Sequence, residues 1–507
     1  VTARRRSESM QEIPVSMTAF TSSDIAEVGI TDISHVSELT PNLVILPNSG
    51  GNDGALICMR GLCRTDFTIT EDPMVGVYLD GIYVGKSIGS LFDVAELERV
   101  EVLRGPQGTL YGRNATGGAV NIITKRPTDE FAGEARLILG NYDRTHAFAA
   151  LSGPLNDRVR ARLAVQKEDR DGYTTVHLPR GTLPASQPDR TFDAEDKHDI
   201  TARATVEVDL TPTAMLTLTG DYYKADDRAN VFHFASLGYQ DEVSGWLGTR
   251  EGSQTLPYFG IKNSGRISAP ASRDIFSAVD YFNETSVWGL TGRLDWALGD
   301  YDVQVITGYK NSNPDFQNSF DLGDTFNTYI HRAEDHEQWN ADFQLSSPSG
   351  GRFSWIAGGG YFSEENDIQN NIFGDFWEPI LTQGLLDLQT AGVLPPFPVS
   401  IPESTLCCEL HLNGRQETEA FNIFIDTSFD LTDRLTLKAG LRYSEEERDG
   451  FQNFDLAFLP SAPGGSLVRF APEVLFFPNA VSESRDGVQP DPFGFVVAPV
   501  EGPATFD

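Results

Sequence analysis

The fold is decided by one stretch near the N-terminus, Glu98-Arg99-Val100-Glu101-Val102-Leu103-Arg104-Gly105-Pro106-Gln107-Gly108-Thr109-Leu110-Tyr111-Gly112. Its first half alternates as a short strand does, with Val100 and Val102 on one face. The opposite face carries Arg99, Glu101 and Leu103. The second half is a Gly/Pro turn that no regular element can hold. Its glycines permit positive φ and close backbone approach, so the stretch predicts a strand that ends in a tight loop.

A second glycine turn, Gly112 to Lys125, follows at once and predicts another strand near residues 119–123. Upstream, residues 11–20 alternate as a strand, and Ser22 to Glu27 read as a capped helix start. A second short helix is expected over residues 32–39, stopped by Pro41. Further short strands are expected near residues 56–60, 75–79 and 98–103. Together these elements predict a compact α+β unit.

These segments, with Leu56 to Gly61 and Val77 to Tyr83, resemble the plug domain of TonB-dependent outer-membrane receptors. The resemblance covers about the first 130 residues. It implies a plug domain at residues 1–130, followed at 131–507 by part of a transmembrane β-barrel that has twenty-two strands in the family.

Composition is compatible with a membrane barrel. The chain has 507 residues, of which 40% are hydrophobic, with a mean hydropathy of −0.27. It contains no run of about 18 apolar residues, which excludes a transmembrane helix but not a barrel of alternating strands. Its 47 Gly, 32 Phe and 15 Tyr suit a β-rich chain with many turns. The net charge of −34 makes nucleic acid an unsuitable partner.

From about residue 133 apolar and polar side chains alternate with period two, as in Val159 to Val165 and Ile200 to Leu210. A soluble sandwich would show the same alternation. We predict eleven strands, over residues 133–140, 145–152, 157–168, 199–209, 214–225, 285–297, 302–310, 337–346, 353–363, 416–429 and 434–444. Most are long enough to cross a bilayer when tilted.

Connection lengths separate the two possibilities. The connections after even-numbered strands are short, as at Gly153 to Asn156. Those after odd-numbered strands, except the first, are long: residues 169–198, 226–284, 311–336, 364–415 and 445 onward. Short turns on one side and long loops on the other are typical of outer-membrane barrels. Residues 445–507 contain no convincing paired strand, so we expect a fragment with about eleven of the family's twenty-two strands, cut inside an external loop.

The chain opens with Val1-Thr2-Ala3, which resembles the tail of the TonB box, the segment that pairs with TonB in the family. No signal peptide is visible, so a leader and the first residues of the box are expected to be missing. The four cysteines do not have zinc-site spacing. Cys58 and Cys63 are either a disulfide around Arg60 or two free thiols; the adjacent Cys407 and Cys408 are expected to find partners elsewhere or none.

Other motifs carry no chemistry. Asp80 to Ser87 has too few residues between its glycines for a phosphate loop and reads as a hairpin turn at Asp80-Gly81. His331 and His336, with Glu334, Asp335 and Glu337, fit no standard metal site and are interpreted as a solvated acidic loop, as is Glu445-Glu446-Glu447. No nucleophile–base pair is credible. We therefore expect no catalytic site, no metal and no cofactor.

Arg60 and Arg104 are the candidate site residues, because each precedes a glycine at the end of a plug strand. The resemblance implies that they pair with barrel glutamates in a plug–barrel lock; the alternative is that they are ordinary plug surface charges. A guanidinium suits a lock because it holds a carboxylate with two hydrogen bonds. The glutamate partners and the ligand-contacting residues cannot be assigned.

The resemblance implies a receptor of the bacterial outer membrane for active uptake of a scarce ligand, first of all a ferric siderophore. TonB, with ExbB and ExbD of the inner membrane, would supply the energy, and lipid would surround the barrel. A carbohydrate, a vitamin or an aromatic compound is the alternative ligand. A soluble β-rich binding or adhesion module is the alternative class, and a signalling transducer would need a further N-terminal domain.

Overall fold

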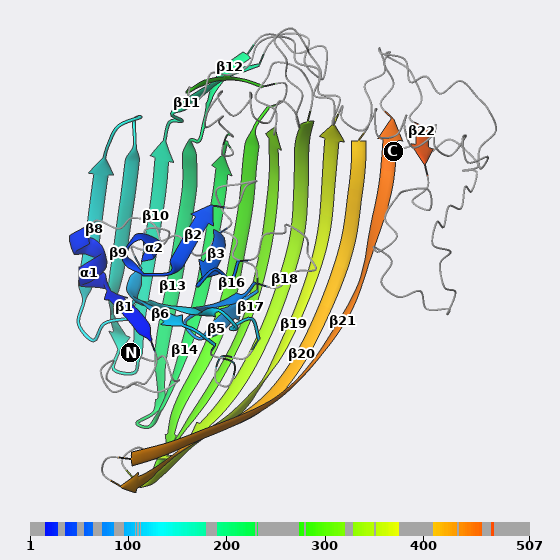
Figure 1. The fold of residues 1–507 in the computed structure, drawn as a ribbon. Helices are drawn as coiled ribbons and strands as arrows, with labels where there is room; N and C mark the ends of the chain where they lie inside the picture. Colours follow the sequence, from blue (N-terminus) through cyan, green and yellow to red (C-terminus); the bar gives the residue numbers. More distant parts are fainter. Residues whose placement is uncertain are drawn as a thin grey trace, which may run out of the picture.

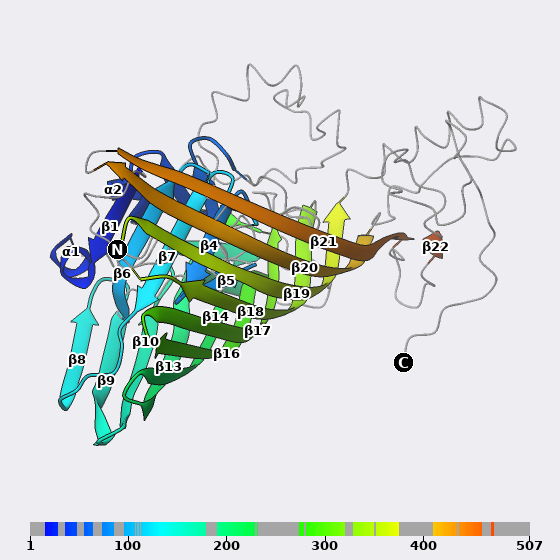
Figure 2. The same ribbon diagram turned by 90° about the horizontal axis from the view of Figure 1, so that it is seen from below.

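The computed structural model describes residues 16–28, 36–47, 55–63, 73–85, 96–106, 108, 111, 113–178, 190–228, 231, 273–277, 280–319, 328–348, 351–374, 409–432, 435–458 and 468–470. A small α+β unit, the plug, lies on the concave side of one long curved sheet, the wall (Figure 1). Seen from below, the wall wraps around one side of the plug (Figure 2). In the described part of the chain no helix has the length and apolarity needed to span a membrane.

The plug contains two short helices, α1 (Ser22–Val28) and α2 (Val36–Leu39), and two sheets. The larger sheet has the order β1-β6-β7-β4-β5, in which only β4 and β7 are parallel. Its strands are β1 (Met17–Thr21), β4 (Val75–Leu79), β5 (Ile82–Val84), β6 (Leu97–Arg104) and β7 (Gly118–Thr124). The smaller sheet pairs β2 (Leu43–Pro47) with β3 (Ala55–Met59). The expected helices and short strands are confirmed where they are described; β2 was not predicted.

Strand β6, the first half of the deciding stretch, is buried on both faces. Val100 and Val102 are fully buried in the core of the plug with Met59 and Val120. On the opposite face Leu103 belongs to a second apolar cluster, which contains Ile356, Phe362 and Phe424 of the wall. Glu101, also fully buried, accepts hydrogen bonds from Asn121 and Arg99. The alternation therefore reflects two packed faces, one inside the plug and one against the wall.

The wall has twelve antiparallel strands in the order β22-β21-β20-β19-β18-β17-β16-β14-β13-β10-β9-β8. All eleven predicted strands are present: β8 (Ala132–Leu139), β9 (Thr145–Asn156), β10 (Val159–Arg170), β13 (Lys197–Thr211), β14 (Ala214–Asp227), β16 (Phe282–Leu298), β17 (Tyr301–Ser319), β18 (Thr328–Ser346), β19 (Phe353–Gly374), β20 (Glu409–Thr432) and β21 (Leu435–Phe458). Their short connections lie at one end, as expected.

Several predicted loops are wrong in part. Residues 311–319, 328–336, 364–374, 409–415 and 445–458 continue the neighbouring strands, and β22 (Val468–Phe470) pairs with β21. Residues 169–198 and 226–284 contain β11 (Thr174–Leu178), β12 (Arg190–Ala194) and β15 (Asp274–Phe276), which form a separate three-stranded sheet. An apolar cluster holds these segments together, made of Val176, Ala194, Val231, Ile275 and Tyr281.

The convex face of the wall carries the apolar side chains. Leu163, Leu218 and Leu290 are exposed there, whereas Ala164 and Thr219, their neighbours in sequence, are buried on the concave side. Aromatic side chains form two rows on this face, one containing Trp288, Tyr309 and Trp339 and the other containing Tyr301 and Trp355. On β17 the rows are eight residues apart, or about 27 Å along the strand, which suits the apolar band of an outer-membrane barrel.

Candidate functional site

The site is the interface between the plug and the wall, and its centre is the β4–β5 hairpin. Asp80 and Gly81 have φ of 49° and 93°, so the predicted Asp-Gly turn is confirmed. The two carboxylate oxygens of Asp80 accept hydrogen bonds from the backbone N–H and the hydroxyl of Thr124, at 2.9 and 2.8 Å. Arg203 of β13 donates to the same carboxylate. Asp80 thus joins two plug strands to the wall.

Gln338 of β18 holds the other end of the hairpin. Its carbonyl oxygen accepts from the backbone N–H of Gly85 at 2.7 Å, and its amide donates to the carbonyl oxygen of Tyr83 at 2.5 Å. Gln338 is buried, so these bonds are shielded from water. A Cβ atom at Gly85 would lie 2.8 Å from Oε1 of Glu364. The glycine therefore lets the hairpin lie close to the Glu364 and Gln338 side chains of the wall without displacing them.

A buried ion pair joins the plug to β10. Nε and Nη2 of Arg162 donate to the two carboxylate oxygens of Glu96, at 2.8 and 2.6 Å. The side chains are 9% and 8% exposed. Parallel donation by both nitrogens is the strongest geometry for an arginine–carboxylate pair. Because a buried charge without its partner is costly, this pair fixes the position of the plug against β10.

Arg113 makes a weaker contact with the far strands of the wall. Its guanidinium carbon lies 4.4 Å from the ring centroid of Phe362, and Nη2 lies 3.4 Å from Oε1 of Glu446. Tyr83 packs edge-on against Phe362, with centroids 5.6 Å apart. Stacking on an aromatic face and pairing with a carboxylate are both typical uses of arginine at an interface.

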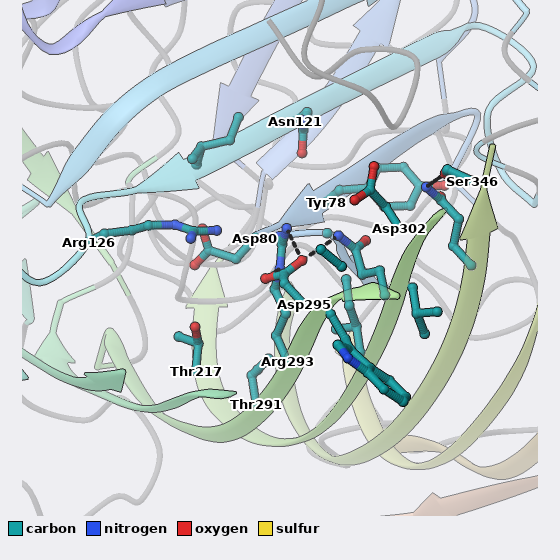
Figure 3. Close-up of a pocket in the computed structure, with 18 of the residues that line it drawn as sticks. Tyr78, Asp80, Asn121, Arg126, Thr217, Thr291, Arg293, Asp295, Asp302 and Ser346 are labelled. Atoms are coloured by element: carbon teal, nitrogen blue, oxygen red, sulfur yellow. Dashed lines mark hydrogen bonds and ion pairs between the residues drawn. The ribbon is translucent and has the colours of Figure 1, made fainter. Parts of the chain in front are cut away.

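Below the hairpin a cavity of about 1000 Å³ separates the plug from the wall. Figure 3 shows Asp80 and Asn121 of the plug facing Arg293, Asp295 and Thr217 of the wall. The lining is mixed in charge and rich in threonine. Nε and Nη2 of Arg293 donate to the carboxylate of Asp295, at 2.7 and 2.9 Å, so the two charges offset each other. Chemically, the cavity suits water and small polar solutes.

The two candidate arginines lie close together. Arg60 has φ of 53° and is exposed, and a Cβ atom at Gly105 would lie 2.9 Å from its Nη1. Arg104 directly precedes that glycine and is half-buried, and its Nε has no hydrogen-bond partner. Within the described ranges no ion pair joins either guanidinium to a wall carboxylate. Their role in a lock stays a prediction, and Val1, Thr2 and Ala3 lie outside the described residues.

The disulfide alternative for Cys58 and Cys63 is the one that the structure forms, with Cα atoms 4.4 Å apart. Cys407 and Cys408 lie outside the described residues.

The histidine cluster is not in a loop, as the sequence predicted, but in strand β18. Nε2 of His331 lies 2.8 Å from Asp315, and Nε2 of His336 lies 2.8 Å from Glu364. His336 is 1% exposed, so it is a wall residue and not a solvated one. Among the described residues no three metal-ligating side chains converge. Glu445, Glu446 and Glu447 are also in a strand, β21, where they are exposed.

Sequence reasoning missed Glu96, Asp80 and Gln338 as interface residues. Asp80 and Gly85 stood inside a quoted motif, but their only signal was a hairpin turn. Glu96 and Gln338 carry no local signal, because their partners are 66 and 255 residues away in the chain.

Comparisons with known proteins agree with this architecture. Residues 9–119 match the family described as "TonB-dependent Receptor Plug Domain", and residues 222–477 match "TonB dependent receptor-like, beta-barrel". The chain is 28% identical over 251 residues to the ferripyoverdine receptor of Pseudomonas aeruginosa, covering 48% of this chain and 28% of that protein. It is 31% identical over 170 residues to the ferrioxamine B receptor of Salmonella typhimurium, covering 32% of this chain and 23% of that protein.

Solved structures show the same fold at low identity. The ferric yersiniabactin uptake receptor FyuA from Yersinia pestis has a TM-score of 0.60 and 16% identity, covering 88% of this chain and 62% of that chain. The ferripyoverdine receptor of the outer membrane of Pseudomonas aeruginosa has a TM-score of 0.58 and 18% identity, covering 91% of this chain and 57% of that one. The chain thus spans less than two thirds of these relatives. With its plug and wall matched, it belongs to the TonB-dependent receptor family of the outer membrane.

Proposed function

We propose that this chain is the plug and one side of the barrel of a receptor that imports a ferric siderophore across the outer membrane. The observation that carries the proposal is the position of the plug on the concave face of a wall whose convex face is apolar. The plug is held there by Glu96–Arg162, Asp80–Arg203 and the Gln338 contacts. A plug held by a few polar bonds and one apolar cluster closes the barrel at rest and can still rearrange. The boundary at residue 130 between plug and barrel belongs to this proposal.

The ligand class follows from the relatives. The ferripyoverdine and ferrioxamine B receptors are named for iron chelates. A vitamin B12 transporter of Vibrio vulnificus is also similar, at 27% identity over 201 residues. A vitamin, a carbohydrate or an aromatic compound is therefore the competing ligand. The protein performs no covalent chemistry in this proposal, because binding and transport need only contacts.

The energy source is TonB, acting with ExbB and ExbD through the segment that ends at Val1-Thr2-Ala3. An extended segment pairs with a partner strand through backbone hydrogen bonds, which proline cannot donate. Replacing Thr2 with Pro should therefore stop uptake while leaving ligand binding at the cell surface intact. Thr2→Ser is the matched control and should transport normally.

The test is uptake by intact cells that carry the full-length receptor. A deletion strain and its complemented partner are grown without free iron, and uptake of radioactive iron is measured for hydroxamate, catecholate and mixed-ligand chelates. We expect one chelate class to depend on the receptor and on TonB. Unchanged iron uptake for every class, together with receptor-dependent uptake of labelled vitamin B12 or a sugar, would replace the siderophore with that ligand.

Arg60 and Arg104 are proposed as the plug side of a plug–barrel lock. The placement of Arg60 supports this, because its Nη1 lies over Gly105, the residue after Arg104. Two positively charged residues at one edge of the plug attract a carboxylate. Arg104→Ala should make the closed receptor leak ions in a planar bilayer. Exposed Arg136, on β8 of the wall, supplies the control variant Arg136→Ala.

A further inference from the structure

Arg60 sits at the first central position of a two-residue hairpin. The backbone N–H groups of Met59 and Leu62 each donate to the other residue's carbonyl oxygen, at 3.1 and 3.0 Å. The φ angles of Arg60 and Gly61 are 53° and 80°, which makes this a type I′ turn. Glycine adopts this conformation freely, but an arginine does not. The turn is therefore disfavoured by its own sequence at Arg60 and depends on its surroundings.

The surroundings are a covalent bridge and one hydrogen bond. Cys58 and Cys63, the residues directly outside the turn, form a disulfide. Cys58 is 5% exposed and pairs with Val44 in the β2–β3 sheet, so one end of the bridge is fixed in the plug. The backbone N–H of Arg60 donates to the carbonyl oxygen of Asn42 at 2.9 Å. A bridge across a hairpin limits the backbone conformations open to the residues that it encloses.

The turn places two side chains against glycines of two neighbouring plug strands, Gly118 at the start of β7 and Gly105 after β6. Met59 is fully buried, and a Cβ atom at Gly118 would lie 2.2 Å from its sulfur. Arg60 reaches over Gly105, where a Cβ atom would lie 2.9 Å from Nη1. Arg104 is paired with Gly118 across β6 and β7. Two glycines of the plug motifs thus make room for two consecutive residues of the bridged hairpin.

We propose that the Cys58–Cys63 disulfide is a positioning element that holds Arg60 in its left-handed conformation and so places its guanidinium over Gly105, the residue after Arg104. The proposal rests on the proposed role of Arg60 in closing the receptor. Opening the disulfide lets the turn relax, which withdraws the guanidinium from Gly105 and weakens closure without touching the wall. The disulfide therefore acts through Arg60 and not as a general stabiliser of the plug.

The test is a coupling experiment on the full-length receptor in planar bilayers. Leak conductance is measured for Arg60→Ala, for the double variant Cys58→Ser/Cys63→Ser, and for the triple variant. We expect the single and double variants each to leak about fivefold more than the unmodified receptor, the factor for about 1 kcal/mol at 1.4 kcal/mol per tenfold. The triple variant should leak no more than Arg60→Ala alone.

The outcomes are distinct. The positioning role is overturned if the double cysteine variant leaks no more than the unmodified receptor. It is also overturned if the leak of the triple variant is the product of the increases caused by Arg60→Ala and by the double variant. A tight Arg60→Ala variant removes the lock on which the proposal rests. If the double variant fails to assemble, the folded receptor is reduced with a phosphine in a Cys407→Ser/Cys408→Ser background. Reduction should then raise the leak conductance of the receptor that retains Arg60 but not that of the Arg60→Ala variant in the same background. An equal rise in both overturns the proposal.

Discussion

The pair Glu96–Arg162 offers the sharpest prediction about what keeps the plug in place. Both side chains are over nine-tenths buried and share two hydrogen bonds of 2.8 and 2.6 Å. Arg162→Ala leaves the Glu96 carboxylate buried and unpaired, which should cost about 3–5 kcal/mol of docking free energy. Divided by a urea slope of about 2 kcal/mol per M, this moves the midpoint of plug release down by about 2 M.

The assay is leak conductance of the full-length receptor in planar bilayers as urea is raised. Arg136→Ala is the matched control, because Arg136 pairs with Glu134 on the same side of the wall but the two side chains are 43% and 38% exposed. An exposed pair contributes about 0–1 kcal/mol, so the control should hardly shift. Replacing both residues, Glu96→Leu with Arg162→Met, should recover most of the loss. Equal shifts for Arg162→Ala and Arg136→Ala would refute the reasoning.

Three further predictions concern the plug. Gly105→Ala places a Cβ atom on a residue with φ of 108° and 2.9 Å from Nη1 of Arg60, so the stability of the plug should fall by about 1–2 kcal/mol. The fall is measured as a lower urea midpoint for leak, and Gly108→Ala, at a position with open space around it, is the control. Asp80→Asn should weaken plug docking by about 1–3 kcal/mol, because Arg203 loses a charged partner, and the same assay checks it. The hydroxyl and backbone N–H of Thr21 hold the pKa of Asp24 below its usual 3.8, so α1 should be stabilised above that pH and lose this contribution as the pH falls below it. The loss is measured as lower protection of the α1 amides from hydrogen exchange, and Asp24→Asn should abolish this pH dependence.

The wall was largely predictable from sequence because each strand separates two solvents. Leu218 faces outward and Thr219 inward, and the same alternation recurs on β10, where Leu163 is exposed and Ala164 is buried. Beyond the membrane limit both faces are polar, so the alternation stops although the backbone pairing continues. Residues 311–319 show this: Asn311, Asn313 and Pro314 read as a loop, yet they extend β17 beside β16. The sequence therefore located the strands but not their outer ends.

The plug–wall interface was not predictable in the same way. The turn at Asp80 is a local property, and its Asp-Gly signal identified it. The contact of Asp80 with Arg203 depends on the register of β13 and on the docking angle of the plug, neither of which is written in a local pattern. Arg60 and Arg104 came from the resemblance; their meeting at Gly105 required coordinates.

The measurement that tests the central claim most directly is the solvent around consecutive residues of β14 in native outer membranes. Spin labels are placed singly at positions 215–224 of the full-length receptor, and collision rates with oxygen and with a water-soluble nickel complex are compared. A plugged barrel in lipid predicts high oxygen and low nickel collision rates at positions 216, 218, 220 and 222, and the reverse or full protection at the odd-numbered positions. Position 224 lies beyond the aromatic row of Trp288, which pairs with Tyr222, and serves as the aqueous reference. Nickel reaching both sets equally would mean that water bathes both faces, which contradicts a wall in lipid.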